Sequence, residues 1–79
     1  MADGAYILIE TNVGASKKVV EAIQKLDGVE SVYQVTGPYD VIATVEGTDL
    51  RAIGSIVTEK IHPIIGISRT VTCLKIGSV

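Results

Sequence analysis

The chain has 79 residues, 47% of them hydrophobic, with a formal net charge of −2 and a mean hydropathy of +0.42, so it is too apolar to be disordered. Its seven Lys and Arg residues are scattered and its pI is about 5.2, which argues against direct nucleic-acid binding because that needs a clustered basic surface. The single cysteine, Cys73, excludes an internal disulfide and any metal site built on paired cysteines.

These properties predict one small domain over residues 1–79. The N-terminus lacks the basic start and apolar run of a signal peptide, and no apolar run reaches the roughly 20 residues that cross a bilayer. We therefore expect a cytoplasmic protein that does not contact a membrane.

The first half of the chain has the pattern strand, helix, strand. Residues 5–11 are rich in branched side chains and apolar on both faces, which is typical of a central strand. Residues 15–27 follow the period of a helix, and Gly28 suits the left-handed position just past its end. Residues 29–35 alternate loosely and predict a second strand. The apolar stripe of the helix consists of Val19, Val20, Ile23 and Leu26.

A turn over residues 36–39 separates this half from a similar second half. It joins the second strand to a third at residues 41–45, and the short connection favours an antiparallel hairpin. Pro38 has a fixed φ and no N–H, so it belongs in the turn.

A second helix is predicted from Thr48 to His62, because Pro63 cannot continue it. Thr48 is its expected N-cap. Gly54 interrupts it at a cost of about 1 kcal/mol relative to Ala, and close backbone packing would explain that glycine. The expected buried stripe consists of Leu50, Ile53, Val57 and Ile61.

A fourth strand is predicted over residues 66–76, with one face under the helices and the other uncovered. The face expected under the helices carries Ile65, Ile67, Val71 and Cys73. The other face carries Ser68, Thr70, Thr72 and Leu74.

The element order βαββαβ predicts an α+β fold, the ferredoxin-like sandwich, with a four-stranded antiparallel sheet and two helices on one face. The strands at residues 5–11 and 41–45 are apolar on both sides, so the uncovered face is expected to be an apolar patch of a size that soluble monomers rarely expose. We therefore expect at least a homodimer that packs sheet against sheet about a two-fold axis.

Catalytic chemistry finds little support in the sequence. His62 is the only histidine, and its position beside Pro63 is typical of a capping or surface residue. Cys73 lies on the face expected under the helices and has no predicted base beside it. Residues 14–17 lack the rest of a phosphate-binding loop pattern. We expect no catalytic residue, no metal and no cofactor.

A binding function has more support. Turn amides around Gly37 can hold a carboxylate, Asp40 can hold an ammonium group, and Thr70 and Thr72 place two hydroxyls on one face of a strand. These groups suit a zwitterionic amino acid. The alternative is that Asp40 supports the turn and the threonines reflect only strand propensity. The candidate ligand-binding residues are Gly37, Pro38, Tyr39, Asp40, Thr70 and Thr72.

Three segments resemble the effector-binding domain of the Lrp/AsnC family: residues 26–29, residues 66–72 and above all residues 29–45, with the Gly37-Pro38-Tyr39-Asp40 turn. The similarity extends over about residues 5–76. It implies a ferredoxin-like RAM domain that dimerises through its sheets, often assembles to octamers, and binds small effectors, usually amino acids, between dimers.

The resemblance also implies that the turn and the threonines are the binding residues. Pro38 replaces a commoner acidic or polar residue there and lacks a backbone amide. Full-length members carry a helix-turn-helix domain, whereas only four residues precede the first strand here. The resemblance is thus to stand-alone members, for which we expect no unaided DNA binding and a full-length relative as a candidate partner. Two alternatives stay open: a structural or partner-regulating protein with a vestigial pocket, and a small dimeric enzyme of the same fold.

Overall fold

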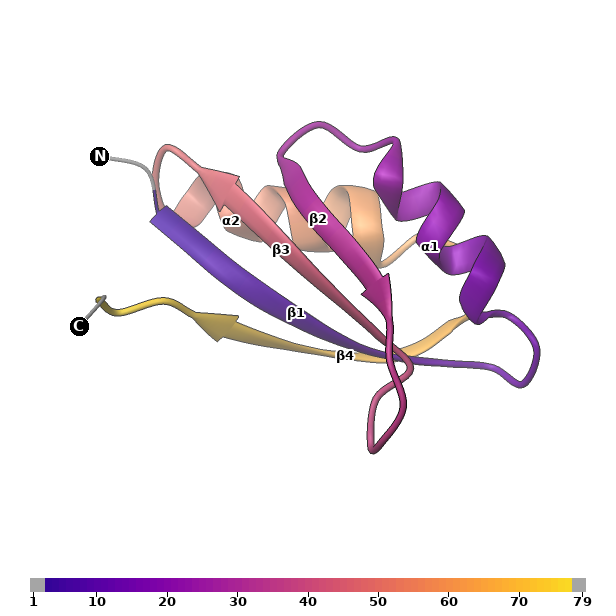
Figure 1. The fold of residues 1–79 in the computed structure, drawn as a ribbon. Coiled ribbons are helices and arrows are strands. Elements are labelled where there is room, and N and C mark those ends of the chain that lie inside the picture. The colour runs from indigo at the N-terminus through magenta and orange to yellow at the C-terminus, as the bar shows by residue number, and fades with distance from the viewer. Residues whose placement is uncertain (1–2, 78–79) are drawn as a thin grey trace.

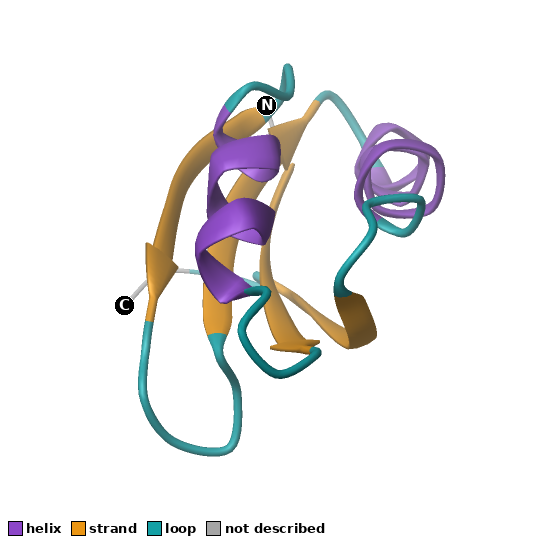
Figure 2. Ribbon diagram, turned by 90° about the vertical axis from the view of Figure 1, so that its right-hand side faces the viewer, coloured by secondary structure: helices purple, strands orange, loops and turns teal. Residues whose placement is uncertain are grey.

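Four strands form one antiparallel sheet in the order β2-β3-β1-β4, and the helical segments cover one of its faces (Figures 1 and 2). The structure is a computed structural model and describes residues 3–77. The ferredoxin-like βαββαβ prediction is confirmed. The elements are β1 (Asp3–Thr11), α1 (Ser16–Gln24), β2 (Val29–Gln34), β3 (Val41–Gly47), α2 (Leu50–Ser55), the π-helical η1 (Ile56–Ile61) and β4 (Ile67–Leu74).

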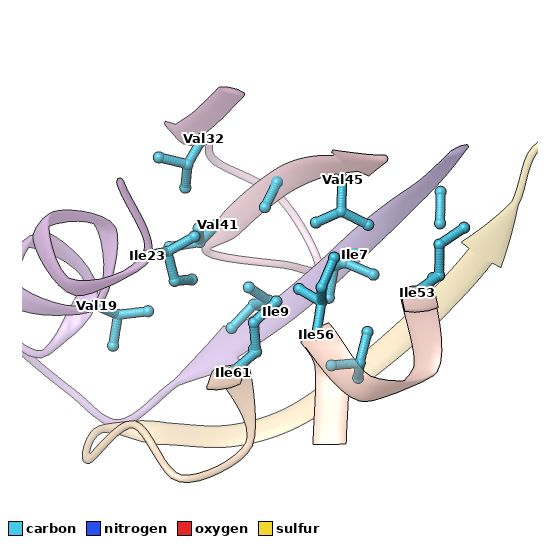
Figure 3. Close-up of a cluster of buried hydrophobic side chains, with 13 residues drawn as sticks. Ile7, Ile9, Val19, Ile23, Val32, Val41, Val45, Ile53, Ile56 and Ile61 are labelled. Atoms are coloured by element: carbon cyan, nitrogen blue, oxygen red, sulfur yellow. The ribbon is translucent and has the colours of Figure 1, made fainter. Parts of the chain in front are cut away.

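The hydrophobic core lies between the helical segments and the two central strands (Figure 3). Side chains alternate between the faces of a strand, so every second residue of β1 and β3 enters this core. Ile7, for example, pairs with Ala43, and both are fully buried. Its neighbour Leu8 points to the uncovered face, as does Tyr6. The fully buried residues of the central strands are Ala5, Ile7, Ile9, Val41, Ala43 and Val45.

The helical side of the core comes from residues at helical spacing. Val19 and Ile23 of α1 are fully buried, as the apolar stripe predicts. The helix ends at Gln24, earlier than predicted, and Gly28 has the predicted positive φ of 92°. Among residues 3–77, no helix is both long enough and apolar enough to cross a membrane.

The second helix differs from the prediction at its start. Asp49, not Thr48, is the N-cap, and its Oδ1 accepts a hydrogen bond from the Ala52 N–H at 2.9 Å. Both residue types are good caps, and the extended backbone of Asp49 decides between them. Leu50 is 58% exposed, so its predicted place in the buried stripe is wrong.

The same helix changes to the wider π form from Ile56. The His62 N–H donates to the Val57 carbonyl at 2.9 Å, five residues back, which marks the π turn. Close packing does not explain Gly54, because a Cβ placed there meets no atom within 4 Å.

A bulge at the start of β4 changes which side chains lie under the helices. Arg69 pairs with Glu10, while Ile67 pairs with Thr11, so β4 uses two residues where β1 uses one. Ile67 packs against the core as predicted. Because the extra residue is Ser68, every side chain beyond it is reversed relative to a regular strand.

The faces predicted for the rest of β4 are therefore wrong. Thr72 lies opposite Ile7 and shares its face, whereas Val71 lies opposite Leu8 and Cys73 opposite Tyr6. Cys73 is exposed on the uncovered face. The residues of β4 that lie on the helix side are Thr70, Thr72 and Leu74.

Candidate functional site

The predicted binding turn lies in the loop between β2 and β3, which extends from the sheet away from the helices (Figure 1). Gly37 has a φ of 130°, a backbone conformation that side-chain-bearing residues rarely adopt. The Val35 N–H donates to the Asp40 carbonyl at 2.9 Å and closes the loop. Gly37 and Pro38 are exposed, while Tyr39 and Asp40 are half-buried.

Asp40 has a structural role at the start of β3. Its Oδ2 accepts a hydrogen bond from the Thr11 N–H at 2.8 Å, and its own N–H donates to the Ile9 carbonyl at 2.9 Å. The side chain thereby continues the β1–β3 ladder beyond Val41, the first residue of β3. One carboxylate oxygen is thus bonded to the backbone, as the turn-supporting alternative requires.

Replacing Asp40 with Ala is expected to lower the free energy of unfolding by about 1 to 2 kcal/mol, because the part-buried Thr11 N–H loses a charged acceptor. Asp40→Asn retains an oxygen acceptor, so its free energy of unfolding should fall by less than that of Asp40→Ala. Urea denaturation of the three proteins measures both values. Equal stability of all three would contradict this role.

Thr70 and Thr72 lie in a groove between α2 and η1 on one side and β4 on the other. The groove has a volume of about 480 Å³. Both hydroxyl-bearing side chains share a face, as predicted, although it is the helix side. The lining residues are Leu50, Ile53, Gly54, Val57, Thr58, His62, Thr70, Thr72 and Leu74.

His62 belongs to this groove, which the sequence did not indicate. Its Nε2 and the Thr70 Oγ1 form a hydrogen bond at 2.9 Å. The histidine follows η1 directly, and the loop through Pro63 brings β4 back beside it. A lone histidine at a helix end carries no local signal for this pairing, since the contact depends on how the helix lies on the sheet.

The groove also has a polar rim on its helical side. The Thr58 Oγ1 donates to the Gly54 carbonyl at 2.8 Å, which satisfies the threonine hydroxyl within its own helix. The structure thus brings Thr70 and Thr72 together with His62. Among the described residues, the groove lining includes none from Gly37 to Asp40.

The uncovered face of the sheet is largely apolar near its centre. Tyr6 is 44% and Tyr33 63% exposed, and Leu8, Ile42 and Val71 are half-buried. Polar groups lie around these residues. They include a hydrogen bond of 2.6 Å between the Ser31 and Thr44 hydroxyls, an ion pair of 3.5 Å between Arg69 and Glu10, and Lys75 Nζ at 5.2 Å from the Tyr6 ring centroid.

The side chains that could ligate a metal are dispersed over the described chain. Residues 3–77 contain no cluster of three or more His, Cys, Asp or Glu side chains that could hold a metal ion. A second hollow, also about 480 Å³, lies beside Gly28 and Gly47 and has Asp27, Glu46 and Glu59 at its rim.

Comparison with known proteins gives a consistent result. Residues 4–79 match the family model described as the Lrp/AsnC ligand binding domain. PF0250, an uncharacterized HTH-type transcriptional regulator of Pyrococcus furiosus, is 35% identical over 71 residues, which are 86% of this chain and 47% of that protein. This chain spans about half the length of the curated regulators that it matches over most of its own length.

Solved structures share the fold over nearly the whole chain. TTHA0845 from Thermus thermophilus, known from a crystal structure, is 35% identical to this chain and superimposes with a TM-score of 0.93. The match covers 98% of this chain and 96% of TTHA0845. The transcriptional regulator NMB0573 from Neisseria meningitidis was solved as an L-Met complex and is 16% identical to this chain, with a TM-score of 0.86. The match covers 98% of this chain and 51% of NMB0573, and at this identity it shows the fold alone. The chain belongs to the Lrp/AsnC ligand-binding domain family.

Proposed function

We propose that this chain is an effector-binding and oligomerisation module that binds a small amino acid between subunits and modulates transcription through a partner regulator. The curated relatives are named as transcriptional regulators. The observation that carries the proposal is the groove in which Thr70 and Thr72 lie beside His62.

The groove has the mixed chemistry that amino-acid binding requires. Threonine hydroxyls both donate and accept hydrogen bonds, so Thr70 and Thr72 can bind either the ammonium or the carboxylate group of an amino acid. Apolar residues on the helical side offer contacts to a ligand side chain. NMB0573, which shares the fold, was solved with L-Met bound, which supports this class of ligand.

The turn residues would complete the site from a second subunit. Gly37 to Asp40 lie outside the groove of their own chain, and their loop extends away from the helices (Figure 1). A ligand that contacts both sets of residues therefore needs the loop of one subunit and the groove of another. Pro38 has no N–H, so the neighbouring amides that remain for a carboxylate in this turn are those of Gly37 and Tyr39.

The assembly that we propose is a homodimer built on the uncovered sheet face. Tyr6, Leu8, Tyr33, Ile42 and Val71 form an apolar surface there that a second copy would cover about a two-fold axis. Further assembly of dimers, up to an octamer, would bring loops to grooves. The module itself would not bind DNA. It would act in the cytoplasm through a full-length relative that does.

A second candidate function is a structural or partner-regulating module with a vestigial pocket. The specific observation in its favour is that the Asp40 carboxylate is bonded to the Thr11 N–H. That bond reduces the capacity of Asp40 to bind a ligand ammonium group.

A thermal-shift screen over the standard amino acids separates the two functions. A ligand at 100 times its Kd adds about 2.7 kcal/mol to the stability of the folded state. We therefore expect at least one amino acid to raise Tm by several degrees at millimolar concentration. Thr72→Ala should abolish the shift, whereas Thr48→Ala, an exposed threonine outside the groove, should preserve it. A flat response across all amino acids would favour the vestigial pocket.

A further inference from the structure

The groove beside β4 contains almost no charge. Its helical side consists of Leu50, Ile53, Gly54, Val57 and Thr58, and its strand side of Thr70, Thr72 and Leu74. Among the lining residues, His62 is the one ionisable side chain, and its Nε2 is already bonded to Thr70. Within the part of the chain that the structure describes, no carboxylate, ammonium or guanidinium group lines the groove.

This lining discriminates between ligand side chains by charge. An ionised side chain that enters the groove gives up water and finds no opposite charge, which strongly disfavours it. An uncharged apolar side chain gains from the same burial, because it removes apolar surface from water. The hydroxyls of Thr70 and Thr72 can still bind the polar backbone groups of the same ligand.

Gly54 leaves part of the groove open. In a helix, residues four apart share a face, so position 54 lies between Leu50 and Thr58 on the side that lines the groove. A Cβ placed at Gly54 meets no atom within 4 Å. A Cβ at this position would therefore lie in open space without displacing a neighbour.

We propose that the groove takes the uncharged, mainly apolar side chain of the effector amino acid, and that Gly54 sets the size of side chain admitted. This inference rests on the proposed function and specifies its ligand class. It assigns Gly54 a role in specificity that neither packing nor helix stability explains.

Two matched ligand pairs test the charge selection. Norleucine has the carbon chain of lysine without its ammonium group, and glutamine is the neutral counterpart of glutamate. By calorimetric titration of the assembled protein, we expect norleucine to bind roughly tenfold or more tightly than lysine, and glutamine more tightly than glutamate. Charged members that bind as tightly as their neutral counterparts would overturn the inference and leave the proposed function standing.

Substitution of Gly54 tests the size limit. Gly54→Leu should weaken norleucine binding by roughly tenfold or more, because the new side chain fills the volume. Gly54→Ala, which favours the helix and adds only a methyl group, should give a smaller loss. Arg51→Leu is the control, since it introduces a leucine on the same helix at a position outside the groove.

The outcomes of this test are distinct. Unchanged norleucine affinity in both folded Gly54 variants, judged by circular dichroism and Tm, would overturn the role of Gly54 while amino-acid binding stands. A wild-type protein that binds none of the four ligands, nor any standard amino acid, would overturn the proposed function and this inference together.

Discussion

Leu8→Lys is expected to convert the assembled protein into folded monomers. Leu8 lies in the middle of β1 on the uncovered face, and its cross-strand neighbours Ile42 and Val71 are also apolar. A two-fold interface repeats every substitution, so the change places two unpaired ammonium groups in one apolar contact. Each buried charge costs several kcal/mol. Analytical ultracentrifugation at micromolar concentration measures the result.

Val13→Lys is the matched control for this experiment, because it makes the same class of change at a fully exposed residue of the β1–α1 loop. Labelling of Cys73 gives a second readout. Its side chain is exposed on the same sheet face in the isolated subunit, so a thiol reagent should react faster with Leu8→Lys than with the wild type. A wild-type monomer, or a Leu8→Lys protein that stays assembled, would contradict the sheet-to-sheet interface.

Ile7→Ala is expected to lower the free energy of unfolding by about 3 to 4 kcal/mol, a large share of the stability of so small a domain. Ile7 is fully buried in β1 between Ala43 and Thr72, and truncation leaves a cavity under the helices (Figure 3). Urea denaturation in the Leu8→Lys background measures this loss without a contribution from association.

The conservative variant Ile7→Val should lower the free energy of unfolding by about 1 kcal/mol, because it removes a single methylene group. Leu8→Ala, made in a monomeric background such as Ile42→Lys, should lower the free energy of unfolding by less than Ile7→Ala does, since Leu8 is only half-buried. The two adjacent residues thus test the two faces of one strand. Similar losses at both positions would contradict the assignment of the core to the helix side.

Most of the fold could be predicted from local patterns. The apolar stripe of α1, the turn at Gly37 and Pro38, and the helix stop before Pro63 each depend on residues close in sequence. The face of β4 could not be predicted, because a bulge opposite Glu10 and Thr11 reverses the strand. A bulge is a property of the pairing between two strands, and alternation along one strand cannot show it.

The candidate site was predicted in part. Thr70 and Thr72 do share one face, since side chains two apart in a strand always do. Their neighbours could not be foreseen, because His62 reaches Thr70 only through the position of η1 on the sheet. The hydrogen bond from the Thr11 N–H to Asp40 likewise joins residues 29 apart in the chain.

The sequence by itself determined the order of elements, the ferredoxin-like class and the family, because periodicity and turn chemistry act over a few residues and the family motifs are contiguous. Only the tertiary structure decided which side of β4 faces the helices, that Asp40 is bonded to the backbone of β1, and that His62 and Gly54 line the groove with the threonines. Each of these depends on strand register or on the position of α2 and η1 relative to β4, and both are fixed by contacts between residues that are distant in the chain.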